Sequence, residues 1–266
     1  MNKPFDGHRA RKRFGQNFLH DQHVIDRIIQ AINPAEDEHV VEIGPGLGAL
    51  TDGLIGNCFL SVIELDRDLA PRLEEKYGQR TDFELHQGDA LKFDFNTLIK
   101  ENHTSKIRLV GNLPYNISTP IIFYLLQFKH HITDMHFMLQ KEVVERMTAK
   151  PGSKTYGRLS VILQYTCEVS HIFNVKPGSF NPPPKVDSAI VRIKPRETIT
   201  EAVTDEGFFQ QLVTQAFSQR RKTIRNTLKT MATEAQLQTA HIDPGARPET
   251  ISIEGFVRLA NVLACQ

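Results

Sequence analysis

The stretch Asn112-Leu113-Pro114-Tyr115 carries residue types that can direct chemistry at an amino nitrogen. It follows the apolar run 107–111, which predicts a short buried strand. The exocyclic amine of a nucleobase is a poor nucleophile because its lone pair is delocalised into the ring. The Asn112 side-chain oxygen and the Leu113 carbonyl can each accept one N–H and so localise and aim that lone pair. Tyr115 can stack on the face of the base.

The same stretch also fits a plain turn between a strand and a helix. In that interpretation Ser118 or Thr119 is the N-cap and Pro120 occupies the first helical position. Pro114 fixes its own φ and keeps the residue before it extended, so the covalent structure sets the direction of the Leu113 carbonyl. The rest of the chain decides between the two interpretations.

Strand-like and helix-like stretches alternate through the first part of the chain. Strands are expected at 39–43, 59–63, 83–86, 107–110 and 135–139, and helices at 49–55, 69–77, 120–128 and 141–147. This alternation predicts an α/β fold with a parallel sheet covered on both faces. Ligands bind at the carboxyl ends of such strands, where Gly44, Glu64, Asp89 and Asn112 are expected to converge.

A change of pattern after Pro195 predicts a second domain. Helices are expected at 208–217, 222–231 and 253–264, with a loop at 241–248. We therefore expect residues 1–196 to form the ligand-binding domain, with a basic N-terminal arm at 1–22. Residues 197–266 would then form a small all-helical C-terminal domain.

The glycine-rich turn after the first expected strand indicates a nucleotide-like cofactor. It lets the backbone approach a ligand beside a helix N-terminus, and Glu64 can accept hydrogen bonds from ribose hydroxyls. Gly44-x-Gly46-x-x-Ala49 with an acid about 20 residues on also fits the dinucleotide fingerprint, so an NAD-dependent oxidoreductase is a competitor. Asp89, although it also fits a turn or cap, suits an adenine pocket. Hydride transfer has no need of Asn112, so the pattern favours S-adenosylmethionine over NAD.

The net charge of +1 hides an uneven distribution along the chain. Residues 34–104 contain 15 acidic and 6 basic residues, whereas 140–196 contain 10 basic and 4 acidic ones. Residues 207–233 contain 5 basic residues and no acidic one, and residues 1–22 contain 5 basic and 2 acidic ones. A chance distribution of surface charge explains any one of these charged blocks more easily than it explains three of them. The pattern indicates one region for a small ligand and others for a polyanion.

The cysteines and the apolar runs indicate a cytoplasmic protein. Cys58, Cys167 and Cys265 are isolated, so neither a disulfide framework nor a zinc site is expected, and no other metal site either. The basic N-terminus lacks the apolar core of a signal peptide, and no run approaches the length of a membrane span. A monomer is the default expectation.

Seven motifs together resemble those of the KsgA/RsmA family of small-subunit ribosomal RNA adenine N6,N6-dimethyltransferases, from about Gly7 to Ala264. They are RKRFGQNFL at 11–19, VEIGPGLG at 41–48, VIELD at 62–66, GNLPYNIS at 111–118, KTYGRLS at 154–160, FNPPPKVDS at 180–188 and FSQRRKTIRN at 217–226. No motif position departs from the family pattern. The extent of the resemblance favours the bacterial enzyme over the related Erm methyltransferases and the mitochondrial members.

The resemblance implies a Rossmann-like class I methyltransferase fold with a small helical C-terminal domain. It implies that S-adenosylmethionine donates methyl groups to N6 of two adjacent adenosines near the 3′ end of 16S rRNA, during maturation of the 30S subunit. By motif position, the cofactor-binding residues would be Asn17, Leu19, Gly44, Glu64, Asp89 and Asn112. Asn112, the Leu113 carbonyl and Tyr115 would serve the target adenine.

Two further sets of residues suit an RNA substrate. Phe180, before the proline run, can supply the second face of a stack on the flipped base, although an ordinary core position is the alternative. Arg220, Arg221, Lys222 and Arg225 are expected on the helix at 222–231, where they would meet phosphates. Arg9, Arg11, Lys12 and Arg13 are expected to form a mobile arm near the cofactor.

Four functions, from three classes of protein, remain open at this point. The leading one is an rRNA adenine dimethyltransferase. A ribosome-assembly factor that acts mainly by binding and an Erm-like methyltransferase acting on 23S rRNA are alternatives to it, and the NAD-dependent oxidoreductase is the third class.

Overall fold

The structure, a computed structural model, describes Arg11, residues 15–101 and residues 106–264 of the chain. Contacts between Cα atoms group the chain into two compact units. The first unit comprises Met1–Val144 and Ser170–Pro195, and the second comprises Glu145–Val169 and Arg196–Gln266. The sequence-based division places Glu145–Val169 in the larger domain, whereas these residues group with the C-terminal helices.

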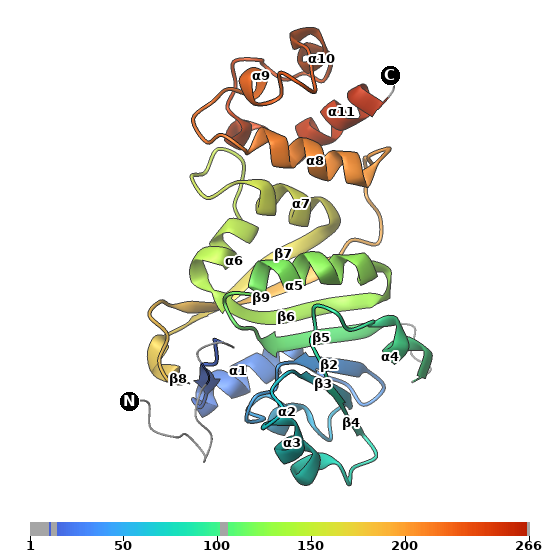
Figure 1. Cartoon of the computed structure of the whole chain (residues 1–266), viewed down its shortest axis with the longest axis vertical. Coiled ribbons are helices and arrows are strands. Elements are labelled where there is room, and N and C mark those ends of the chain that lie inside the picture. Colours follow the sequence, from blue (N-terminus) through green and yellow to red (C-terminus); the bar gives the residue numbers. More distant parts are fainter. Residues whose placement is uncertain (1–10, 12–14, 102–105, 265–266) are drawn as a thin grey trace. The chain divides into compact units, whose positions relative to one another are not determined.

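A seven-stranded sheet forms the centre of the first unit, in the order β4-β3-β2-β5-β6-β9-β7 (Figure 1). Its strands are β2 (His39–Ile43), β3 (Phe59–Glu64), β4 (Phe83–Gln87), β5 (Ile107–Asn112), β6 (Ile132–Gln140), β7 (Cys167–Val175) and β9 (Ser188–Pro195). Strands β4, β3, β2, β5 and β6 pair in parallel, and β9 pairs antiparallel to β6.

The five parallel strands confirm the predicted α/β fold, and the sheet as a whole is mixed. β9 adds an antiparallel strand from a region where the sequence analysis expects none. All five residues of β2 are buried, as in a sheet covered on both faces. The helices of this part are α1 (Gln22–Ile32), α2 (Thr51–Leu54), α3 (Ala70–Tyr77), α4 (Asn96–Glu101) and α5 (Ser118–Leu125), followed by the 3₁₀ helix η2 (Leu126–His131).

Helix α5 begins two residues earlier than predicted, so Pro120 is not its first residue. Its N-cap is Ile117, with no capping hydrogen bond from a side chain. The hydroxyl of Ser118 instead donates to the Pro114 and Tyr115 carbonyls, each at 3.2 Å. The turn that carries Tyr115 is therefore tied to the start of the helix.

A two-stranded sheet lies apart from the main sheet. β1 (Phe18–Leu19) pairs antiparallel with β8 (Phe180–Asn181), which follows the 3₁₀ helix η3 (Pro177–Ser179). His20 N donates to the Ser179 carbonyl at 3.0 Å, and the Ser179 hydroxyl donates to Asp21 at 2.8 Å. These bonds fix the chain that leads into α1.

The second unit is helical, with aromatic rings in its core. Its helices are the end of α6 (Lys141–Met147), α7 (Arg158–Thr166), α8 (Glu206–Ala216), α9 (Ile224–Thr227), α10 (Glu234–Thr239) and α11 (Ile253–Ala264), with the 3₁₀ helix η4 (Pro248–Thr250). The rings of Tyr165 and Phe209 lie 4.8 Å apart, and those of Phe217 and Phe256 lie 5.7 Å apart. The helix predicted at 222–231 is reduced to four residues, so Arg220, Arg221 and Lys222 precede it in a turn.

Membrane spans and metal clusters are absent from the part of the chain that the structure describes. None of its helices is long and apolar enough to cross a membrane, and it gathers no group of three histidine, cysteine or acidic residues that could hold a metal ion. Cys58 and Cys167 are buried free thiols, and Cys265 lies outside the described residues.

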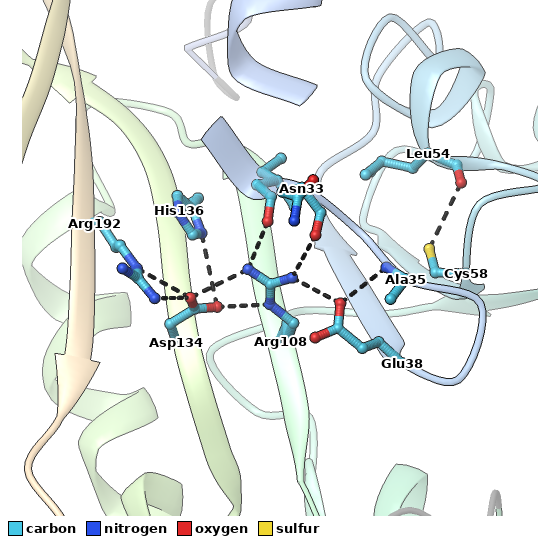
Figure 2. Close-up of polar contacts among 10 residues, drawn as sticks. Asn33, Ala35, Glu38, Leu54, Cys58, Arg108, Asp134, His136 and Arg192 are labelled. Atoms are coloured by element: carbon cyan, nitrogen blue, oxygen red, sulfur yellow. Dashed lines mark hydrogen bonds and ion pairs between the residues drawn. The ribbon is translucent and has the colours of Figure 1, made fainter. Parts of the chain in front are cut away.

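A buried ionic network centred on Arg108 ties α1 to the sheet (Figure 2). Its guanidinium donates to Asp134 at 2.8 and 3.2 Å, to Glu38 at 2.7 Å and to the Ile32 carbonyl at 2.7 Å. Burial alone would raise the pKa of Asp134, but the hydrogen bonds from Arg108 hold it below its usual value. Each buried charge has a partner of opposite sign, and these pairings offset the free-energy cost of removing the charges from water.

Replacing Arg108 with Met is expected to lower the free energy of unfolding by about 3–5 kcal/mol, because the buried Asp134 loses its main partner. Arg192 donates to the same carboxylate at 2.9 Å but is largely exposed. Arg192→Met is therefore the matched control, with an expected loss of about 1 kcal/mol or less. Urea unfolding followed by circular dichroism measures both, and equal losses would contradict the dominant role of Arg108.

Candidate active site

A cavity of about 360 Å³ opens at the carboxyl ends of β2, β3, β4 and β5. This volume is within the range of small-molecule sites. The cavity brings together every residue predicted to bind the cofactor and three of the residues predicted to serve the base, with Asn112 predicted for both roles. These are Asn17, Leu19, Gly44, Glu64, Asp89 and Asn112, with Leu113 and Tyr115.

Glu64 is held in place by the backbone around it. One carboxylate oxygen accepts from Gly46 N at 3.1 Å and the other accepts from Asp66 N at 2.7 Å. Gly46 has a φ of +62°, and a Cβ at this position would lie 3.3 Å from the Phe18 ring. Burial raises the pKa of Glu64, opposed by these hydrogen bonds. The glycine turn and the acid predicted to meet a ribose are thus one preformed unit.

Asn112 is oriented by the N-terminal segment. Its side-chain nitrogen donates to the Asn17 carbonyl at 2.9 Å. The side-chain oxygen of Asn112 receives no hydrogen bond from the described residues, so it remains available as an acceptor. The Leu113 nitrogen donates to the Met138 carbonyl at 3.2 Å, whereas the Leu113 carbonyl is likewise without a donor among the described residues. Asn112 and Leu113, two successive residues that line the cavity, therefore each keep one acceptor oxygen without a donor among the described residues.

Tyr115 is fixed through its hydroxyl rather than its ring. The hydroxyl lies 2.6 Å from that of Ser188, the first residue of β9. Burial raises the pKa of Tyr115, which keeps the phenol protonated. The antiparallel strand that the sequence analysis did not expect thus anchors a residue of the site.

Asp89 is a turn residue, as one of its two interpretations predicts, and it also lines the cavity. One of its oxygens accepts from Leu91 N at 3.0 Å, which closes the turn after β4. Ala90 beside it is buried and also lines the cavity. The other oxygen of Asp89 has no partner among the described residues.

The N-terminal segment forms one wall of the cavity. Arg11 pairs with Asp66 at 2.9 Å and with Asp68, and Gln16 donates to Asp66 at 3.0 Å. Gly15 to Leu19 line the cavity. Of the arm predicted to be mobile, Arg9, Lys12 and Arg13 lie outside the described residues, and Arg11 is tied down.

Phe180 is not among the residues that line the cavity. It is 3% exposed, pairs with Leu19 across the two-stranded sheet and belongs to the hydrophobic core. Its ring offers no open face to a base in this conformation. Arg220, Arg221, Lys222 and Arg225 belong to the second unit, where Arg225 pairs with Glu234 at 3.1 Å.

Two residues of the site lie inside motifs quoted above but were not singled out. Gly111 allows the close approach of β5 to β2, since a Cβ there would lie 2.5 Å from the Ile43 carbonyl oxygen. Glu42 lines the cavity, is 1% exposed and accepts from the Thr51 hydroxyl at 2.7 Å. Burial raises the pKa of Glu42 to about 8. Their positions beside Asn112 and Gly44 were the only signal in the sequence.

The comparison with protein families decides between the cofactors considered above. The model of the family "Ribosomal RNA adenine dimethylase" matches residues 7–265. The chain belongs to this family. Its enzymes are S-adenosylmethionine-dependent methyltransferases, so the NAD-dependent alternative is wrong.

Curated relatives and solved structures agree with the dimethylase family. "Ribosomal RNA small subunit methyltransferase A" of Pseudomonas putida is 57% identical over 100% of this chain and 99% of its own length. The protein of the same name from Acinetobacter baylyi is 52% identical, covering 98% and 95%. A dimethyladenosine transferase from Plasmodium falciparum has a TM-score of 0.77 at 28% identity, covering 91% of this chain and 95% of that one. The 23S rRNA methyltransferase ErmE has a TM-score of 0.73 at 27% identity, covering 93% and 100%.

The buried carboxyl of Glu42 predicts a pH dependence of stability. The folded state keeps its proton up to about pH 8, whereas the unfolded state loses it near the ordinary value. Stability of the wild type should therefore fall as the pH rises from about 5 to 8, relative to Glu42→Gln, by about 1.4 kcal/mol per pH unit. Urea unfolding of both proteins across this range measures the difference. Glu36→Gln, at an exposed position, controls for the loss of one carboxyl, and parallel curves for wild type and Glu42→Gln would contradict the assignment.

Proposed function

We propose that this protein dimethylates N6 of two adjacent adenosines near the 3′ end of 16S rRNA, within the immature 30S subunit. The relatives named for the small subunit are 52–57% identical to the chain, whereas ErmE is 27% identical, which favours this target over 23S rRNA. The substrate matures in the cytoplasm, where we place the enzyme.

The cavity fits S-adenosylmethionine, which supplies an electrophilic methyl group when bound. Glu64 would accept hydrogen bonds from the ribose hydroxyls, and the partner-free oxygen of Asp89 would accept one from the exocyclic amine of the cofactor's adenine. The glycine turn at Gly44 would let the backbone approach, while Asn17 and Leu19 close the opposite wall. These roles rest on the partner-free oxygen of Asp89, on the lone pairs that the Glu64 carboxylate keeps beside its two backbone bonds, and on the lining of the cavity.

The observation that carries the proposal is the pair of acceptors at Asn112 and Leu113. A target adenine rotated out of its stack would place its N6 against them, at a cost of a few kcal/mol. The Asn112 oxygen and the Leu113 carbonyl would accept the two N–H groups and direct the lone pair at the methyl group. No general base is needed, because the product loses its proton to solvent after attack. Catalysis would thus be mainly orientation in a preformed polar site.

Stacking against the base is proposed for Tyr115, whose ring lines the cavity. For Phe180 the same role requires that its buried ring leave the core or that an edge be uncovered when RNA binds. Arg220, Arg221, Lys222 and Arg225 are proposed to contact phosphates, since all four are exposed. Such contacts give affinity without reading the sequence.

Replacing Asn112 with Ala should abolish methyl transfer while leaving binding of the methyl donor measurable. The variant removes the acceptor oxygen, and with it the orientation of the amine, so we expect kcat to fall by at least about 100-fold. Single-turnover transfer to unmethylated subunits and calorimetric binding of the donor measure the two effects separately.

Asn116→Ala provides the matched control, because Asn116 lines the same cavity and is of the same type. Its kcat should stay within a few-fold of the wild type, since it lies beyond the two acceptors in the turn before α5. Wild-type turnover in Asn112→Ala would refute the role given to the side-chain oxygen.

A further inference from the structure

The motif KTYGRLS at 154–160 lines no part of the cavity. It begins in the segment before α7, within the second compact unit. We call residues 150–158 the Lys150 loop, seen as the yellow-green loop before α7 in Figure 1. It contains Lys150, Lys154 and Arg158 and no acidic residue.

Several hydrogen bonds hold the Lys150 loop in one shape. Gly152 N donates to the Glu249 carbonyl at 2.6 Å, and Gly157 N donates to the Ser160 hydroxyl at 3.1 Å. The ring of Tyr156 is buried, with its centroid 6.1 Å from that of Phe217. A loop anchored in this way presents its lysines at fixed places and loses little entropy when it binds a partner.

Arg220 joins the Lys150 loop to the basic turn before α9. Its guanidinium donates to the Lys154 carbonyl at 3.2 Å. The backbone of the loop therefore lies against the segment that carries Arg221 and Lys222. This contact brings residues of the basic block 140–196 next to residues of the basic block 207–233, so that they form one surface.

The charges of this surface are available for a ligand. Lys150, Lys154, Arg221 and Lys222 are all exposed, and none forms an ion pair with another described residue. The side chain of Glu249, whose carbonyl supports the loop, faces Arg247 at 3.8 Å instead. Unpaired cations on a rigid surface suit a polyanion, whose binding releases counterions.

We propose that Lys150 and Lys154 bind phosphates of the RNA substrate together with Arg221 and Lys222, so that the Lys150 loop is part of the RNA-binding surface. This inference rests on the proposed function. It assigns a role to a motif that neither the cavity nor the methyl-transfer chemistry uses. The contacts would position the RNA rather than read its bases.

Charge reversal tests the proposal with unmethylated small ribosomal subunits as the probe. Lys150→Glu and Lys154→Glu each change an exposed side chain and keep the backbone bond between Arg220 and Lys154. Arg221→Glu is the reference for the turn. Lys106→Glu, the same change at the exposed residue before β5, is the control. Subunit affinity is measured between about 50 and 200 mM salt, with donor affinity and circular dichroism as checks on the fold.

Each loop variant should bind subunits about tenfold more weakly and lower the slope of log affinity against log salt by about one, while donor affinity stays unchanged. If both loop variants bind like Lys106→Glu while Arg221→Glu binds weakly, the loop proposal is overturned and the proposed function stands. If all four variants bind and methylate like the wild type, the whole surface is excluded as the RNA site. If the wild type itself neither binds nor methylates subunits, the proposed function fails, and the loop proposal fails with it.

Discussion

The hydrogen bond from the Asn112 side chain to the Asn17 carbonyl joins residues 95 positions apart and orients the group on which the proposed chemistry depends. A primary amide can present either its nitrogen or its oxygen to a ligand, and methyl transfer to an amine requires the oxygen. Because the Asn17 carbonyl accepts one N–H of the Asn112 amide, the amide nitrogen points to Asn17 and the amide oxygen is left to accept a hydrogen bond from a ligand. The N-terminal segment thus lines the cavity and also sets which atom of Asn112 would meet the proposed target base.

Contacts in the surrounding fold hold Asn112 and the chain next to Asn17 in place. Gly111 lets β5 approach β2 closely, so Asn112 leaves the sheet beside the glycine turn that follows β2. The pairing of β1 with β8 and the bonds of Ser179 hold the chain just after Asn17. Near the start of β5, the Arg108 network fixes the end of α1 against β5 and β6 (Figure 2). Both ends of α1 are therefore held by contacts with other segments.

The sequence predicted the parts of the structure that depend on local pattern. Strands β2 to β6 stand where apolar runs end in glycine, acid or amide residues, and Gly44, Glu64, Asp89 and Asn112 meet at one edge because parallel strands share that edge. The antiparallel β9 was missed because its place is set by pairing with β6, a contact with no local signal. Phe180 was placed at the base for its ring type, whereas its burial follows from the pairing with Leu19.

Charge located the basic regions of the chain but did not predict their local structure. The helix expected at 222–231 is four residues long. The amides of its first two residues, Ile224 and Arg225, donate to the carbonyls of Ala246 and Pro244 in the loop that follows α10. The basic residues at 150–158 were counted with the larger domain, yet their backbone lies against Arg220. Both differences come from contacts between distant segments, which composition and periodicity do not contain.

The most direct measurement is transfer of labelled methyl groups from S-adenosylmethionine to small subunits that lack this methylation, followed by digestion of the RNA and mapping of the modified bases. If the two free acceptors at Asn112 and Leu113 direct an adenine N6, label will be found as N6,N6-dimethyladenosine at two adjacent positions near the 3′ end of 16S rRNA. Label on another base or another RNA, or no transfer by protein that binds the donor, would contradict that assignment.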